Sequence, residues 1–151
     1  SKNCYKGSMK TKLLTICLLL VTSQVFADMI SLYKLNSKDT VFVSERCAAN
    51  ALAISIMLSK TNNKNAEQSY KKNYEDWVSI GMELLTNKKV YDSEGEVLNH
   101  VINNVLDLQK QISTDMDKFY ISGGKALSGY VADDMDVCNK SLNNIRSQYN
   151  N

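Results

Sequence analysis

The sequence predicts an all-α protein: a four-helix up-down bundle closed by one disulfide, following a cleaved signal peptide. Four segments repeat apolar residues at intervals of three and four, as a helix with one buried face does. The 151-residue chain has no proline and only six glycines, so the commonest helix breakers are scarce. The joints between the segments are short and polar, which makes successive helices antiparallel neighbours.

The N-terminal 27 residues have the layout of a secretory leader. Met9 is followed by two nearby lysines, an apolar run at residues 13–21, and Val-Phe-Ala at 25–27, which places small residues around the cleavage point. The apolar run is shorter than the about 20 residues that a membrane span needs. We expect residues 9–27 to be a signal peptide and residues 1–8 a leader or an expression remnant. The mature protein is then periplasmic or secreted, with no membrane span after cleavage.

Cleavage after Ala27 leaves residues 28–151, a length of 124 that suits a single helical domain. The removed part holds four lysines and no acids, so the remainder has 14 basic and 16 acidic residues and a formal charge of −2. Its lysines are interleaved with acids and form no long basic run. This pattern argues against a nucleic-acid-binding protein.

Two cysteines remain in the mature chain, Cys47 and Cys138, after Cys4 and Cys17 leave with the leader. An even pair in an oxidising compartment predicts a disulfide. This bridge would close a loop of about 90 residues, for which the chain-entropy model gives about 4–5 kcal/mol of stabilisation. The alternative is a pair of buried free thiols.

The first predicted helix covers residues 39–60, with Ser37 or Asp39 as its N-cap. The second covers residues 65–87. The apolar stripe of the first helix consists of Val43, Cys47, Ala51, Ile54 and Leu58. The stripe of the second consists of Tyr70, Tyr74, Trp77, Gly81 and Leu84, widened by Val78 and Leu85. Residues 28–36, before the first helix, fit either a short strand or an arm over the bundle.

The third predicted helix covers residues 94–120 and the fourth covers residues 126–149. The third repeats apolar residues every seven positions, at Leu98, Val105, Ile112 and Phe119, with Val101 and Leu108 between them. The fourth has a stripe of Leu127, Val131, Met135, Cys138, Leu142, Ile145 and Tyr149. Both mature cysteines therefore lie on apolar stripes, and an up-down order can place the first and last helices side by side.

His100 is the only histidine, and no haem-attachment motif accompanies it. It fits a solvated helical histidine, which is the commoner case, or a non-covalent haem ligand with Met57 or Met135. A zinc site needs more histidine and cysteine ligands than the mature chain keeps free. We predict no cofactor and no metal site.

Asp133, Asp134 and Asp136 cluster on the last predicted helix, and Glu75 lies on the second. Helical spacing puts Asp133 and Asp136 on one side, where one carboxylate can raise the pKa of the other. That arrangement would suit a small carboxylate-dependent hydrolase. The alternative is a solvated acidic face opposite the apolar stripe, and we predict no catalytic residues.

Tyr130 lies one position off the apolar stripe, which predicts that its ring is exposed, whereas Trp77 is predicted to lie in the core. No set of nucleophile, base and orienting group can be assembled from the sequence. The sequence therefore favours a non-enzymatic, protein-binding role.

The layout of a signal peptide, one cysteine in the first helix, one in the last, and about 120 mature residues resembles small periplasmic helical immunity proteins. Those proteins block toxic cell-wall amidases of competing bacteria. The resemblance implies a toxin as partner and inhibition by covering the partner's active cleft. The predicted partner-binding surface is then an exposed one that consists of Tyr130, Asp133, Asp134 and Asp136. The alternatives are a periplasmic chaperone or stress protein, whose partners are client proteins, and the carboxylate-dependent hydrolase.

Overall fold

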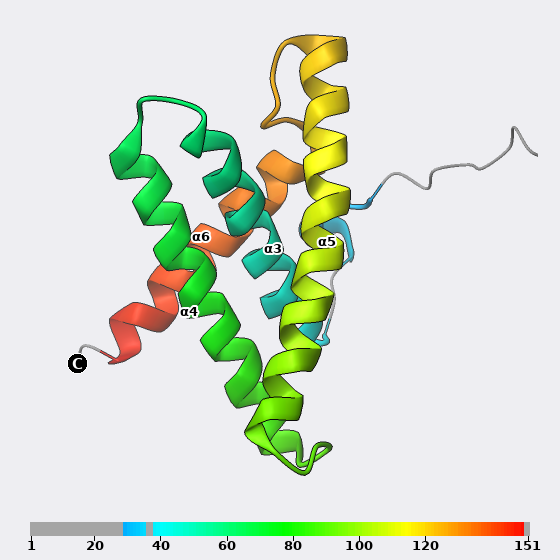
Figure 1. Ribbon diagram of the computed structural model, residues 1–151, viewed down its shortest axis with the longest axis vertical. Helices are drawn as coiled ribbons and strands as arrows, with labels where there is room; N and C mark the ends of the chain where they lie inside the picture. The colour runs from blue at the N-terminus through cyan, green and yellow to red at the C-terminus, as the bar shows by residue number, and fades with distance from the viewer. Residues whose placement is uncertain (1–28, 36–37, 150–151) are drawn as a thin grey trace, which may run out of the picture.

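The computed structural model describes residues 29–35 and 38–149 (Figure 1). These residues form a one-turn helix, α2, followed by the four long helices that the sequence predicts, and they contain no strand. The helices are α2 Leu32–Leu35, α3 Thr40–Ser59, α4 Lys64–Lys88, α5 Glu94–Gly123 and α6 Gly129–Tyr149. The predicted signal peptide, residues 9–27, lies outside the described residues, as does Ser37.

The four long helices alternate in direction along the chain, as an up-down bundle does (Figure 1). Helices α3, α4 and α5 lie side by side, while α6 crosses the others at a slant instead of running parallel to them. The slant matters because it brings α6 against α3 in the middle of the bundle and lets α6 diverge from α4 further along. The bundle prediction is therefore confirmed, with a tilted fourth helix.

Helix α3 is the central element of the bundle. Asp39 caps its start, accepting hydrogen bonds from the backbone N–H groups of Val41 and Phe42 at 3.1 and 3.3 Å. Burial on α3 extends beyond the predicted stripe, and Ala48, Ala49 and Ala53 are at most 1% exposed. Small side chains on several sides let the neighbouring helices approach closely, which is why α3 is buried almost all round.

By length and composition alone, α3 is also apolar enough to cross a membrane, the one such helix in the described part of the chain. However, 67% of its most apolar 18-residue window is buried inside the bundle. The helix also carries Glu45 and Arg46, which are 5% and 2% exposed and have partners on other elements. These features are those of a core helix.

Helix α4 packs closely on α3 at Gly81. A Cβ atom added to Gly81 would lie 2.9 Å from the Ser44 hydroxyl, whose oxygen already donates to the Val41 carbonyl at 2.7 Å. The missing side chain therefore sets the distance between the two helices at this level. Trp77, one turn earlier on α4, is 4% exposed, so the prediction that it lies in the core is confirmed.

The buried face of α5 differs from the predicted face at the start of the helix, where it is shifted by one residue. Val97 is 2% exposed, whereas Leu98, the first position of the predicted seven-residue repeat, is 41% exposed. An ideal α-helix has 3.6 residues per turn, so a strict repeat of seven drifts around the helix over the three intervals from Leu98 to Phe119. The helix ends at Gly123, and its C-cap, Gly124, has a φ of 71° that favours glycine.

The start of α6 and the residues before α3 differ from the expectations. Helix α6 begins at Gly129, because Gly129 has a φ of 54° and residues 126 to 128 form a turn closed by the Ser128 N–H and the Ala126 carbonyl. The short strand considered for residues 28–36 is wrong. Its described part contains α2, which packs against α6 as an arm over the bundle.

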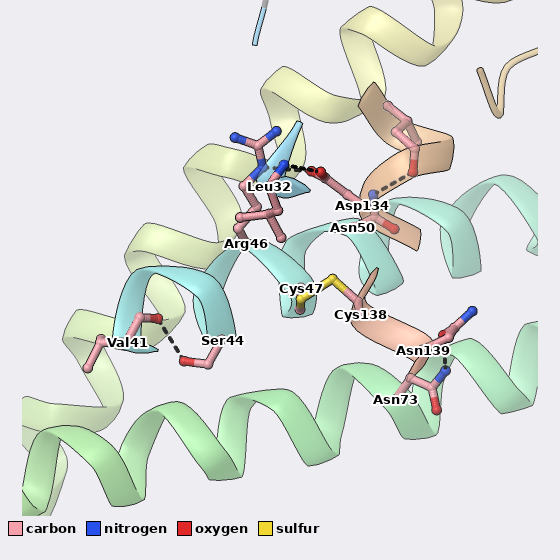
Figure 2. Close-up of a disulfide and its surroundings, with 11 residues drawn as sticks. Leu32, Val41, Ser44, Arg46, Cys47, Asn50, Asn73, Asp134, Cys138 and Asn139 are labelled. Atoms are coloured by element: carbon pink, nitrogen blue, oxygen red, sulfur yellow. Dashed lines mark hydrogen bonds and ion pairs between the residues drawn. A yellow bond between two sulfur atoms is a disulfide. The ribbon is translucent and has the colours of Figure 1, made fainter. Parts of the chain in front are cut away.

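Cys47 of α3 and Cys138 of α6 form the predicted disulfide (Figure 2). Their Cα atoms are 5.5 Å apart and the two residues are 0% and 4% exposed. The bridge spans 91 positions of sequence and joins the first and last long helices. It therefore closes nearly the whole bundle into one covalent loop.

Candidate protein-binding site

Two residues of the predicted partner-binding surface are buried. Asp134 is 0% exposed and Tyr130 is 8% exposed, so the expectation that they form an exposed surface is wrong. The reason is helical geometry: positions 130, 134 and 138 follow one another at intervals of four, and Cys138 is fixed in the core by the disulfide. Their face of α6 is the one that the arm and α3 cover.

Asp134 lies at the centre of a buried polar network (Figure 2). The Arg46 Nε donates to Asp134 Oδ2 at 2.7 Å, and the Leu32 backbone N–H donates to Oδ1 at 2.6 Å. The other end of the guanidinium donates from Nη2 to the Ile30 carbonyl at 2.6 Å. Beside it, Asn50 Nδ2 donates to the Val131 carbonyl at 3.2 Å. The network ties the arm, α3 and α6 together.

Tyr130 completes this network from the side of α5. The Arg46 guanidinium carbon lies 5.2 Å from the centre of the Tyr130 ring, within the range of a cation–π contact. The Tyr130 hydroxyl donates to Asp115 Oδ2 at 2.9 Å. Burial and the neighbouring Asp115 carboxylate raise the pKa of Tyr130, which keeps the phenol protonated.

Burial also raises the pKa of Asp134, against the opposing effects of the Leu32 N–H and Arg46. Both carboxylate oxygens of Asp134 have donors within 2.7 Å, and the residue has no exposed surface. Asp134 is therefore a structural residue that holds the arm. The sequence alone missed this role because Arg46 lies 88 positions away.

Asp133 and Asp136 are exposed on the outer side of α6, as predicted. Asp136 Oδ2 accepts from Lys140 Nζ at 2.7 Å, an exposed ion pair of the kind that contributes little to stability. Glu75 is also exposed, on α4. A partner-binding role for Asp133 and Asp136 remains a prediction.

His100 belongs to a separate cluster between α3 and α5. Its Nε2 lies 3.0 Å from Asn104 Nδ2 and 3.8 Å from Glu45 Oε1, and its ring packs on Tyr91 with centroids 5.2 Å apart. Asn104 Nδ2 also donates to both Glu45 oxygens at 3.2 Å. Burial raises the pKa of Glu45, while Asn104 and His100 partly oppose that shift. In the described residues, no group of three or more histidines, cysteines, aspartates or glutamates is arranged to hold a metal ion.

A groove between α4 and α6 is the candidate binding site. The two helices cross near the middle of α4 and then diverge toward the end of α6 (Figure 1). Two adjoining hollows, of about 310 and 340 Å³, lie in the space between them and share part of their lining. Their shared lining consists of Ile80, Glu83, Ile145 and Tyr149. Each hollow is within the size range of ligand-binding clefts, about 300–1,000 Å³.

The groove has an apolar floor and a polar rim. Ile80, Leu84 and Ile145 are half-buried and line the floor, and Tyr149 is 76% exposed at one side. Tyr149 was predicted to continue the apolar stripe of the last helix, so its exposure is a correction. The divergence of the helices leaves the last turn of α6 without a neighbour to cover that ring.

Arg146 and Asp76 close the groove where the helices cross. The Arg146 guanidinium donates to Asp76 Oδ2 from Nε at 3.0 Å and from Nη2 at 2.6 Å, and Nη2 also donates to Asn73 Oδ1 at 3.0 Å. Asn73 in turn donates to Asn139 Oδ1 at 3.3 Å (Figure 2). Arg146 is thereby neutralised by this contact across the two helices.

Glu83 is the other acidic residue on the rim. It is exposed, and no ion pair within the described part of the chain involves it. Asp76 is paired with Arg146 at 2.6 Å and with Lys72 at 3.5 Å, so Glu83 is the carboxylate of the lining that has no cation beside it in the described part of the chain. The groove thus combines unpartnered apolar side chains with an available carboxylate.

Comparisons of this chain with protein-family models, with curated proteins and with solved structures gave no significant match.

Proposed function

We propose that this chain is an exported, non-enzymatic protein-binding protein that acts as an immunity or inhibitor protein against a toxin directed at the cell wall. The observation that supports this role is the α4–α6 groove, an apolar depression with a charged rim on a disulfide-closed bundle. Apolar surface gathered in one place and edged by polar groups is typical of protein-interaction sites.

The disulfide supports the exported part of the proposal. Cys47 and Cys138 are joined although 91 positions separate them, and such bridges persist mainly in oxidising compartments. The predicted signal peptide at residues 9–27 points to the same compartment. The two features come from different parts of the chain and are independent of each other.

The carboxylate contacts favour binding over hydrolysis. Asp134 is held by Arg46 and the Leu32 N–H, and Asp136 is paired with Lys140. A general acid or base must reach its substrate, and Asp134 has no exposed surface from which to do so. Two of the three aspartates considered for a hydrolase thus have structural or surface partners already.

The proposed mechanism is occlusion. The groove holds one segment of the toxin, and the rigid bundle covers the toxin's active cleft. The cross-link between α3 and α6 and the buried Arg46–Asp134 pair keep the bundle from deforming, which lowers the entropy that binding would cost. Asp133 and Asp136 would add contacts from the outer side of α6.

The test is protection in living cells. A susceptible bacterium would express either the full chain or the chain starting at Asp28 without its leader, and would receive periplasm-directed products of the genes adjacent to its own. We expect the full chain to restore growth against one product, and the leaderless chain, which stays in the cytoplasm, to give no protection. Equal protection by both forms, or none against any neighbouring product, would contradict the proposal.

A periplasmic chaperone is the second candidate, favoured by exposed apolar residues at the end of α5. Tyr120 and Ile121 are 63% and 84% exposed. Such a chaperone is expected to expose more apolar surface in acid and to bind a hydrophobic dye there. The raised pKa values of Glu45 and Asp134 act against acid opening, because the folded state accepts these protons more readily than the unfolded chain does. Dye binding measured between pH 7 and pH 4 separates the two candidates.

A further inference from the structure

The shape and charge of the α4–α6 groove restrict the kind of segment that it can hold. From Asp76 to Asn87 the groove follows 12 residues of α4, whose 11 steps of 1.5 Å give a length of about 16 Å. On α6 it follows Leu142 to Tyr149. A segment of about three helical turns has the same length.

The backbone chemistry of the groove favours a helical segment over an extended one. An extended peptide needs a strand edge to satisfy its N–H and C=O groups, and the described residues contain no strand. A helix satisfies these groups internally and presents only side chains. Its apolar residues at intervals of three and four would contact Ile80, Leu84 and Ile145, the half-buried floor of the groove.

The charge of the rim determines the polar edge of that helix. Arg146 is neutralised by Asp76 at 2.6 Å, whereas the exposed carboxylate of Glu83 has no cation beside it in the described part of the structure. A lysine or arginine at the edge of the incoming helix would supply that cation, and an acidic residue there would be repelled. The formal charge of −2 on residues 28–151 also attracts a basic helix, over longer distances.

We propose that the α4–α6 groove binds an amphipathic helix of the partner protein, about three turns long, whose apolar face has a lysine or arginine at the edge that meets Glu83. This inference rests on the protein-binding function proposed above and names the kind of segment that the function requires. It does not depend on the identity of the toxin.

The test uses two fluorescent 12-residue helical peptides with the same leucine positions, one with lysines and one with glutamates on the polar face. The protein is the oxidised product that cells export when they express the full chain. We expect the leucine–lysine peptide to bind and the leucine–glutamate peptide to bind at least tenfold more weakly. In Glu83→Lys, we expect the affinity for the leucine–lysine peptide to fall by at least tenfold. Glu75→Lys makes the same charge change at an exposed position of α4 outside the groove lining, and we expect a change of less than twofold.

Several results would overturn the inference. Equal losses in Glu83→Lys and Glu75→Lys would show general charge attraction without a site. Unchanged binding in Glu83→Lys would show that the peptide sits elsewhere. Concentration-dependent dimerisation that Glu83→Lys abolishes, measured by sedimentation equilibrium, would assign the groove to a second copy of the chain. Competition by a peptide of residues 9–27, stronger than by the leucine–lysine peptide, would assign it to the leader.

The two proposals can fail separately. If the wild-type chain protects cells and Glu83→Lys protects them equally, the helix inference is wrong while the inhibitor function stands. If the peptides bind as expected but the chain protects against no neighbouring product, the groove binds basic helices and the proposed immunity function is wrong. Circular dichroism of Glu83→Lys and Glu75→Lys, which alter exposed side chains, verifies that both variants fold.

Discussion

Replacing Cys47 and Cys138 together by alanine is expected to lower the free energy of unfolding by about 4–5 kcal/mol. The magnitude follows from the 91 positions that the bridge spans, because a cross-link restricts the unfolded chain in proportion to the logarithm of the loop length. Single domains are stable by only about 5–15 kcal/mol, so this is a large share of the total. For a domain of this size the midpoint of thermal unfolding should fall by about 15–20 °C.

The assay is urea and thermal unfolding followed by far-ultraviolet circular dichroism, comparing the oxidised wild type with the double alanine variant. Because the bridge acts mainly on the unfolded chain, the native spectra of the two proteins should coincide. Wild type treated with a reductant is the matched control and should resemble the variant. A loss below about 1 kcal/mol would refute the loop-closure reasoning. Two titratable thiols in the exported protein would refute the bridge itself.

Three further predictions concern buried contacts. Asp134→Ala should cost about 3–5 kcal/mol in urea unfolding, because it leaves the Arg46 guanidinium buried without its carboxylate. The double replacement Arg46→Met with Asp134→Leu should lower the free energy of unfolding by less than Asp134→Ala does, because it leaves no buried charge. An equal or greater loss would show that the unpaired Arg46 charge does not cause the effect of Asp134→Ala. Gly81→Ala should be destabilising by about 1 kcal/mol in the wild type, where its Cβ meets the Ser44 hydroxyl at 2.9 Å. In a Ser44→Ala background, Gly81→Ala should stabilise the protein by up to about 1 kcal/mol, because alanine has the higher helix propensity. If Gly81→Ala changed the free energy of unfolding with the same sign in both backgrounds, the close contact with Ser44 would be excluded as the reason. The raised pKa of Glu45 means that its contribution to stability is complete below the ordinary pKa of 4.5 and is lost as the pH rises through its folded value. The stability of the wild type relative to Glu45→Gln should therefore increase as the pH falls from 7 to 4, and a decrease over that range would contradict the shift.

The positions of the helices could be predicted from the sequence because helix formation depends on local pattern. Asp39 caps α3, and the polar joints and Gly124 end the helices, within a few residues of the predicted bounds. The disulfide was also predictable, since two cysteines on apolar stripes leave only one intramolecular pairing. These features depend on residues close together in sequence, or on the absence of any other cysteine from residues 28–151.

The candidate site could not be predicted in the same way. Whether Asp134 is a surface acid or a buried ion-pair partner depends on Arg46, which lies 88 positions away, and on the arm that contributes the Leu32 N–H. The sequence therefore predicted correctly that Asp133 and Asp136 are exposed and wrongly that Tyr130 and Asp134 are.

The sequence by itself determined the helices, their order and the bridge, because periodicity, capping and cysteine number are properties of the chain. Only the tertiary structure decided the angle at which α6 crosses the bundle, and this angle creates the groove. A helix stripe specifies which face is buried but not the direction in which its partner runs. That direction results from side-chain packing among several helices at once, with Gly81, the alanines of α3 and the Arg46–Asp134 pair all contributing.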